Sequence, residues 1–126
     1  MSFLPPADLE YLTSKGLAFE EVEQDGKKAV IFPARRLPDG RFDAASADVL
    51  VFLPKGYPDV APDMFHALPW LKLKKTNAYP RKADQSVTFC GKNWQRWSRH
   101  NKEWRPGTDG IWTVLKRIET ALVEAA

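Results

Sequence analysis

Residues 104–122 read WRPGTDGIWTVLKRIETAL, and this stretch contains the strongest helix pattern in the chain. Apolar residues recur there at the three- and four-residue spacing that places them on one helical face. These residues are Ile111, Val114, Leu115, Ile118 and Leu122. Asp109 is a suitable N-cap, because its carboxylate can accept hydrogen bonds from the first helical N–H groups. A helix with one apolar face needs a second layer to pack on, so the fold depends on what precedes it.

The preceding part of the chain has the pattern of an antiparallel meander. A short helix is predicted over residues 8–15, ending at Gly16. Tight-turn signals, among them Asp25-Gly26, separate short runs typical of strands. The predicted strands are residues 17–24, 28–33, 47–53 and 64–71. Residues 75–110 contain several Pro and Gly residues and are predicted to be a long irregular segment, a feature that is often functional.

These elements predict an α+β fold with a short N-terminal helix, a four-stranded antiparallel meander, a long active-site loop and a C-terminal core helix packed on the sheet. The 126 residues, 44% apolar and 28% charged, are typical of one globular domain, 1–126. No apolar run approaches the roughly 20 residues of a membrane-spanning helix, and no signal-peptide pattern begins the chain. One cysteine cannot form an internal disulfide, which favours the cytoplasm.

Cys90 is the candidate catalytic residue. It follows the apolar run 86–89 and precedes Gly91 in a segment with a strong excess of positive charge, since residues 72–105 carry ten Lys and Arg against two acidic residues. Nearby cations favour the thiolate, which is the nucleophilic form of cysteine. The alternative is that Cys90 is a small packed apolar residue. The single cysteine and the distant His66 and His100 do not have the spacing of a zinc site, so neither a metal nor another cofactor is predicted.

The order of the landmarks around Cys90 resembles that of the ubiquitin-conjugating enzymes of the UBC-like superfamily. The turn 57–62, read YPDVAP, comes first, and Trp104-Arg105-Pro106 and the helix opening 114–118 follow the cysteine. The resemblance covers roughly residues 8–122. One motif departs from it: the family's His-Pro-Asn is replaced by Tyr79-Pro80-Arg81, which keeps only the proline. Together with the single helix after the cysteine, this points to a compact, divergent bacterial branch.

The resemblance implies a carrier reaction. Cys90 would accept a ubiquitin-like protein as a thioester from an activating-enzyme-like protein and pass it to a protein acceptor, and the pathway that the resemblance implies is bacterial antiviral defence. The missing asparagine leaves the donor to the oxyanion open. His100 is the favoured candidate, as a donor or general base, and Asn93 is another. Tyr79 would hold the loop in place of the family's histidine.

Other residues of the long segment are candidates for supporting roles. Trp97, Arg96 and Arg99 are candidate partner-binding groups, because tryptophan and arginine are enriched at interfaces. Further polar candidates for the oxyanion are Asn77, Ser98 and Asn101. Two alternatives to the carrier function remain open. The chain could be a non-catalytic UBC-like binding module, or it could bind nucleic acid through the basic, aromatic-rich segment 72–105.

Overall fold

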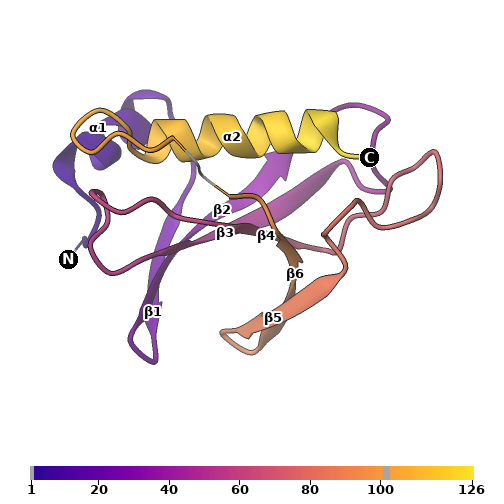
Figure 1. Cartoon of the computed structure of the whole chain (residues 1–126), viewed down its shortest axis with the longest axis horizontal. Coiled ribbons are helices and arrows are strands. Elements are labelled where there is room, and N and C mark those ends of the chain that lie inside the picture. Colours follow the sequence, from indigo (N-terminus) through magenta and orange to yellow (C-terminus); the bar gives the residue numbers. More distant parts are fainter. Residues whose placement is uncertain (1, 101–102) are drawn as a thin grey trace.

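The structure is a computed structural model that describes residues 2–100 and 103–126. Its elements, in chain order, are α1 (Pro6–Ser14), β1 (Glu20–Gln24), β2 (Lys27–Arg36), β3 (Ser46–Leu53), β4 (Phe65–Leu68), β5 (Gln85–Phe89), β6 (Lys92–Trp97) and α2 (Ile111–Glu124). The strands form one antiparallel sheet in the order β1-β2-β3-β4-β6-β5, and α2 lies across one face of it (Figure 1). The predicted α+β fold, with a short first helix and a core helix last, is confirmed.

The main core lies between α2 and the sheet. The five apolar residues that define the face of α2 are all buried, as their spacing predicted. They pack against alternate residues of the central strands, among them Val49 and Val51 of β3 and Phe65 of β4. Leu12 of α1 and Trp97 of β6 complete this layer and are fully buried.

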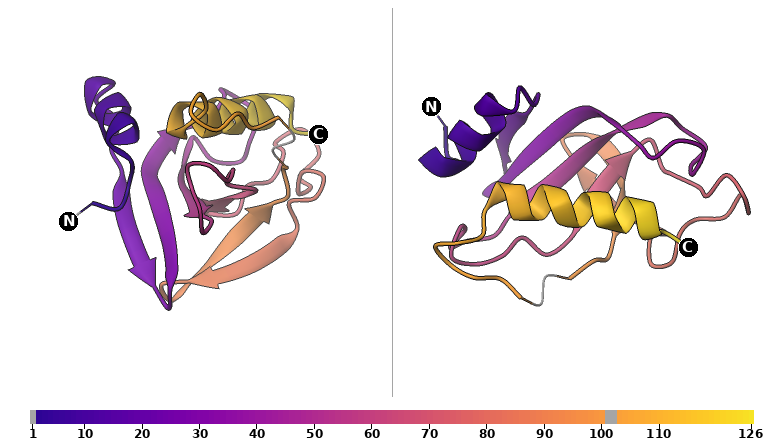
Figure 2. Two further views of the ribbon diagram at one scale, coloured as in Figure 1. Left: turned by 60° about the vertical axis from the view of Figure 1, so that its left-hand side comes forward. Right: turned by 90° about the horizontal axis from the view of Figure 1, so that it is seen from above.

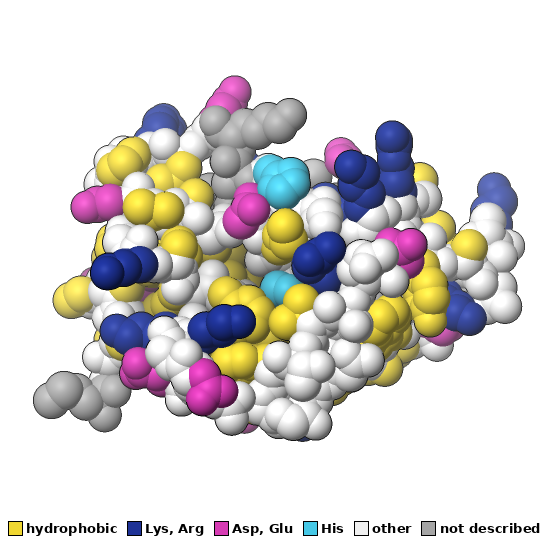
Figure 3. Space-filling view, turned by 60° about the horizontal axis from the view of Figure 1, so that its bottom comes forward, with side chains coloured by type: hydrophobic (Ala, Val, Ile, Leu, Met, Phe, Trp, Pro, Cys, Tyr) yellow, Lys and Arg dark blue, Asp and Glu magenta, His cyan; other side chains and the backbone are white. Residues whose placement is uncertain are grey.

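The sheet is curled, so that its two outer hairpins approach each other on the side away from α2 (Figure 2). A second, smaller cluster fills this side, with Ala29, Leu50, Phe89 and Trp94 buried in it. Figure 3 views the molecule from below and shows hydrophobic side chains gathered in the middle of this face, with cationic side chains at their border. No helix among residues 2–100 and 103–126 is both long and apolar enough to cross a membrane.

The segment that was predicted to be irregular contains the β5–β6 hairpin, so the sheet has six strands where the sequence predicted four. The strand pattern was hidden because both faces of β6 are occupied by bulky side chains. Trp94 packs into the smaller cluster, while Gln95 and Trp97 are buried on the side of α2. A second difference concerns β4, which ends at Leu68 because Pro69 cannot donate a ladder hydrogen bond.

The N-terminus of α2 also differs from the prediction. The N-cap is Gly110 rather than Asp109. Asp109 instead accepts hydrogen bonds from Arg105 N–H and from the hydroxyl of Thr113. The first helical N–H, that of Ile111, donates to the carboxylate of Asp8. Glycine is required at position 110 because a Cβ there would lie 2.8 Å from Asp8 Oδ1 and 2.6 Å from the ring of Trp112.

A buried glutamine attaches the chain around residues 71–83 to the sheet. The side chain of Gln95 is completely inaccessible to solvent. Its Oε1 accepts hydrogen bonds from Leu71 N–H at 2.8 Å and Trp97 Nε1–H at 3.1 Å. Its Nε2 donates to the carbonyls of Leu71 at 3.0 Å and Ala83 at 2.8 Å. All hydrogen-bonding capacity of the amide nitrogen is used, which is what burial of a polar side chain requires.

Candidate active site

Cys90 lies at the tip of the β5–β6 hairpin. Phe89 and Lys92 form the last pair of the ladder, so Cys90 and Gly91 are the two connecting residues. Their φ angles are +53° and +72°, and a positive φ at both central residues is characteristic of the type I′ turn that favours two-residue hairpins. The thiol of Cys90 is free and the residue is partly exposed. A thiol at a hairpin tip is accessible to a second protein without movement of the core.

The backbone of Cys90 is held by the hairpin at the opposite edge of the sheet. Oε1 of Gln24, the last residue of β1, accepts a 2.9 Å hydrogen bond from Cys90 N–H. This contact joins the tips of the β1–β2 and β5–β6 hairpins (Figure 2). Cys90 also packs against the smaller apolar cluster that contains Phe89 and Trp94. The backbone of the thiol-bearing residue is therefore fixed although the residue lies at a turn.

Asn93 is the only proposed supporting residue that the structure places next to Cys90. It lies in β6 directly opposite Thr88, one pair away from the turn. Its backbone carbonyl accepts a hydrogen bond from Trp70 Nε1. Within the described part of the chain its side-chain amide has no hydrogen-bond partner, and the residue is exposed. By the alternation along β6 its side chain lies on the face of Gln95 and Trp97, whereas Cys90 packs against the cluster of Phe89 and Trp94 on the other face, so Asn93 is close to the thiol in register only.

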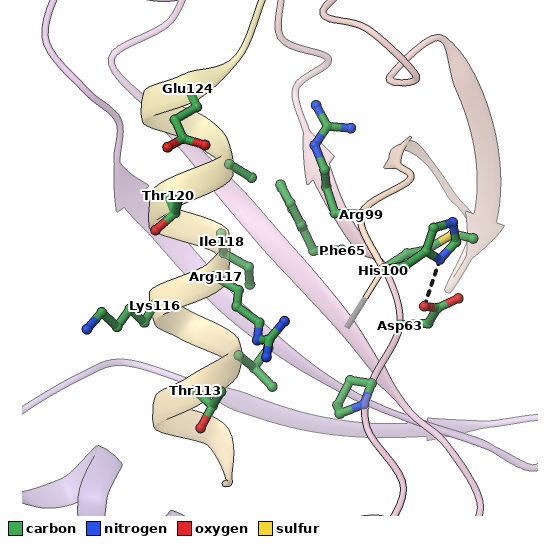
Figure 4. A pocket seen from close by; sticks show the side chains of 14 residues that line it. Asp63, Phe65, Arg99, His100, Thr113, Lys116, Arg117, Ile118, Thr120 and Glu124 are labelled. Carbon is green, nitrogen blue, oxygen red and sulfur yellow. Dashed lines mark hydrogen bonds and ion pairs between the residues drawn. The ribbon is translucent and has the colours of Figure 1, made fainter. Parts of the chain in front are cut away.

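His100 is not brought to Cys90. It lies beyond the far end of β6, and the six residues of β6 alone span roughly 16 Å at the usual rise of about 3.3 Å per residue. Its Nδ1 is 2.8 Å from Oδ1 of Asp63, and both side chains are more than half exposed. Figure 4 shows this pair on one wall of a cavity beside α2. In this arrangement His100 cannot act as the donor or base that its sequence position suggested.

Tyr79 does not contact Cys90 in the described part of the chain. Its exposed ring packs edge-on against Trp70, with ring centroids 5.5 Å apart, and Lys72 Nζ lies 5.2 Å from its centroid. The hydroxyl of Tyr79 makes no hydrogen bond to any residue that the structure describes. Tyr79 therefore supports its loop by aromatic packing rather than by the hydrogen bonding expected of a histidine substitute.

The candidate partner-binding residues have separate environments. Trp97 is fully buried and stacks on Phe65 at 5.1 Å, so it is a core residue and not a surface anchor. Arg96 faces the side of the sheet away from α2, opposite His66 in the ladder. Burial in the first place, and the charge of Arg96 in addition, lower the pKa of His66 to about 4. Arg99 lies over the ring of Trp97 at 5.1 Å, beside α2.

The remaining candidates lie away from the thiol or beyond what is described. Ser98 lies near His100, and its N–H donates to Lys82 O. Asn101 lies outside the described residues. Burial of Trp94 and Trp97 makes these two aromatic rings of the segment inaccessible to a stacking nucleic-acid base. The sequence did not point to Gln24, since its contact with Cys90 spans 66 residues and depends on the curl of the sheet.

The architecture described here, a helix packed on a curled antiparallel sheet with a cysteine between the meander and that helix, fits the UBC-like fold. The model of the family described as Prokaryotic E2 family E matches residues 4–125. The chain therefore belongs to this family of prokaryotic E2 proteins, which confirms the resemblance to a bacterial UBC-like branch. Neither a curated protein nor a solved structure matches the chain.

Proposed function

We propose that this protein is an E2-like carrier that holds a ubiquitin-like protein as a thioester on Cys90. The observation that carries the proposal is the position of the thiol. Cys90 is a partly exposed, unpaired cysteine with φ of +53° in a chain of the prokaryotic E2 family. Asparagine, aspartate or glycine is favoured at such a turn position. A cysteine kept there against local preference is more readily explained by chemistry than by packing.

The proposed reaction has two acyl transfers. The Cys90 thiolate attacks the C-terminal carbonyl of the ubiquitin-like protein on the activating enzyme, and the activating enzyme's thiolate leaves. An acceptor amine then attacks the new thioester, an amide forms, and the Cys90 thiolate leaves while the amine proton passes to solvent. The amide of Asn93 is the side-chain donor that we assign to the oxyanion of the second step. A reducing compartment such as the cytoplasm would keep the thiol available, and antiviral defence is the proposed pathway.

A second candidate function is a non-catalytic binding module. The observation that favours it is the contact of Cys90 with the apolar cluster around Phe89 and Trp94. In this alternative the cysteine completes the packing of the hairpin tip, and the exposed surface alone is functional. The two candidates differ in whether Cys90 forms a covalent adduct.

A charging assay separates them. The protein is incubated with ATP, a cognate activating-enzyme-like protein and its ubiquitin-like protein, and is then analysed on a non-reducing gel. We expect an adduct that thiols release, and for Cys90→Ser we expect none or a thiol-resistant ester. Lys92→Ala, which changes the next exposed side chain, is the matched control and should charge normally. An uncharged wild-type protein beside a charged activating enzyme would leave the binding module as the function.

A further inference from the structure

A cavity of about 570 Å³ lies beside α2, away from the cysteine. One wall is α2, and the other consists of residues 62–65 and 99–100, at the far ends of β4 and β6 (Figure 4). Helix α1 lies on the other side of α2 (Figure 2), so it does not cover this cavity. The volume is within the range of about 300–1,000 Å³ that is usual for ligand-binding clefts.

The floor of the cavity is apolar. Phe65 of β4 and Val114, Ile118 and Ala121 of α2 line it. Ala121 is partly exposed, whereas Phe65 and Ile118 are almost fully buried and present only small surfaces. Such a floor accepts an aliphatic side chain of a ligand. It offers no open aromatic face on which a nucleotide base could stack.

Two arginines stand on opposite walls of this floor. Figure 4 shows Arg117 projecting from α2 toward the strands and Arg99 on the facing wall, whereas the end of Lys116, another lining residue, is directed away from that wall. Arg99 is partly buried over Trp97, and among the described residues its side chain donates to the neighbouring carbonyl of Ser98. In the same described part of the chain, Arg117 donates to the carbonyl of Glu103.

These two arginines are not in ion pairs within the described chain, although Asp109, whose pKa is lowered mainly by the hydrogen bond from Arg105 N–H, is also within electrostatic reach of Arg117. Among residues 2–100 and 103–126, no carboxylate lies within ion-pair distance of either guanidinium. Asp63, on the same wall as Arg99, is already paired with His100. Glu124 also lines the cavity, but it is seven residues beyond Arg117 on α2, or about 10 Å along the axis. Partial removal from water lowers the pKa of Arg99.

We propose that this cavity docks an acidic, apolar peptide segment of a partner protein, with one carboxylate between Arg99 and Arg117 and an aliphatic side chain on Phe65 and Ile118. Arginine suits this role because its planar fork binds carboxylates in a bidentate manner. The site is separate from Cys90, since it lies at the opposite end of β6. It therefore does not depend on whether Cys90 forms a thioester.

The test uses two fluorescein-labelled hexapeptides, acetyl-ELEFEL-amide and acetyl-KLKFKL-amide, and measures fluorescence anisotropy with the full chain. We expect the acidic peptide to bind with a Kd below about 1 mM, weakening as salt increases, and the basic peptide not to bind. Arg99→Gln combined with Arg117→Gln should weaken binding about tenfold or more. The matched control, Arg81→Gln with Lys82→Gln, removes the same charge from an exposed loop and should bind as the wild type does.

A second variant keeps the test independent of any folding defect in the arginine double variant. Ala121→Glu places a carboxylate on the cavity floor and should abolish binding of the acidic peptide, with an unchanged circular dichroism spectrum. Absence of binding at 1 mM peptide, equal binding of both peptides, or wild-type affinity in the double variant would each refute the proposal. A labelled oligonucleotide that binds the wild type and is lost in the double variant would assign the cavity to nucleic acid instead.

Discussion

The hydroxyl of Tyr57 donates a 2.5 Å hydrogen bond to Oδ2 of Asp8, a carboxylate with only 1% of its surface exposed. The other oxygen of Asp8 accepts the first N–H of α2, at Ile111. A carboxylate is favourable at this position because of the positive end of the helix dipole. One side chain of α1 thus connects the turn before β4 with the start of the core helix. Burial raises the pKa of Tyr57 well above its ordinary value, so the phenol remains a donor.

Tyr57→Phe should lower the free energy of unfolding by about 1–3 kcal/mol, because it leaves a buried carboxylate oxygen without its donor. Urea denaturation followed by circular dichroism measures this change. Tyr79→Phe is the control, since that hydroxyl makes no hydrogen bond within the described chain, and it should change stability by less than about 0.5 kcal/mol. Equal effects of the two substitutions would mean that the bond to Asp8 contributes nothing.

The buried His66 should make the protein acid-sensitive. Its pKa is about 4 in the folded protein, against an ordinary value of 6.5. As the pH falls below 6.5 the unfolded chain takes up the proton first, so stability decreases until about pH 4. The difference corresponds to about 3 kcal/mol at most. His66→Phe should flatten this dependence between pH 6.5 and 4, whereas His100→Phe, at an exposed position, should leave it intact.

Gln95→Leu should destabilise the protein by at least about 3 kcal/mol. The substitution keeps the side-chain volume but leaves the backbone groups of Leu71, the carbonyl of Ala83 and the indole N–H of Trp97 without partners. Gln85→Leu, at an exposed position of β5, is the matched control and should cost less than about 0.5 kcal/mol. Thermal unfolding of both variants measures the difference, and similar melting temperatures would contradict the structural role of Gln95.

Asn93→Ala should leave charging of Cys90 intact and slow discharge of the thioester to free lysine by about tenfold or more. The measurement is single-turnover discharge on a non-reducing gel. His100→Ala is the control, because His100 lies at the far end of β6, and its discharge rate should equal that of the wild type. The opposite result, slow discharge only in the His100 variant, would require a rearrangement of β6 during the reaction.

Cys90→Asn should raise the free energy of unfolding by up to about 1 kcal/mol, because asparagine tolerates the positive φ that Cys90 adopts. Cys90→Val should lower it, since a β-branched side chain is disfavoured there. Both variants should fail to form the adduct. Equal stability of the two variants in urea denaturation would mean that the turn relaxes around the side chain. Position 90 would then have no preference for asparagine over valine.

Much of the fold follows from local patterns. The apolar face of α2 and the glycine-containing turns before residue 54 are determined by nearby residues, so the core helix and the first three strands were predicted within a few positions. The β5–β6 hairpin was missed because a cysteine occupies its turn and a buried glutamine interrupts the apolar pattern of β6. Within the site, the order of motifs pointed to Cys90. His100 was favoured because it lies only ten residues after Cys90. In a folded-back loop the two side chains could meet, but the extended strand β6 between them holds them far apart.

The bond between Gln24 and Cys90 ties the position of the thiol to the assembly of the whole sheet. All the strands lie between the two hairpin tips that this bond joins, from the first edge of the sheet to the last. Contacts between such distant parts of a chain form only when the loops between them have closed. A partly folded or damaged sheet would therefore hold the cysteine in a different place. The position of the Cys90 thiol is thus set only when the sheet is completely folded.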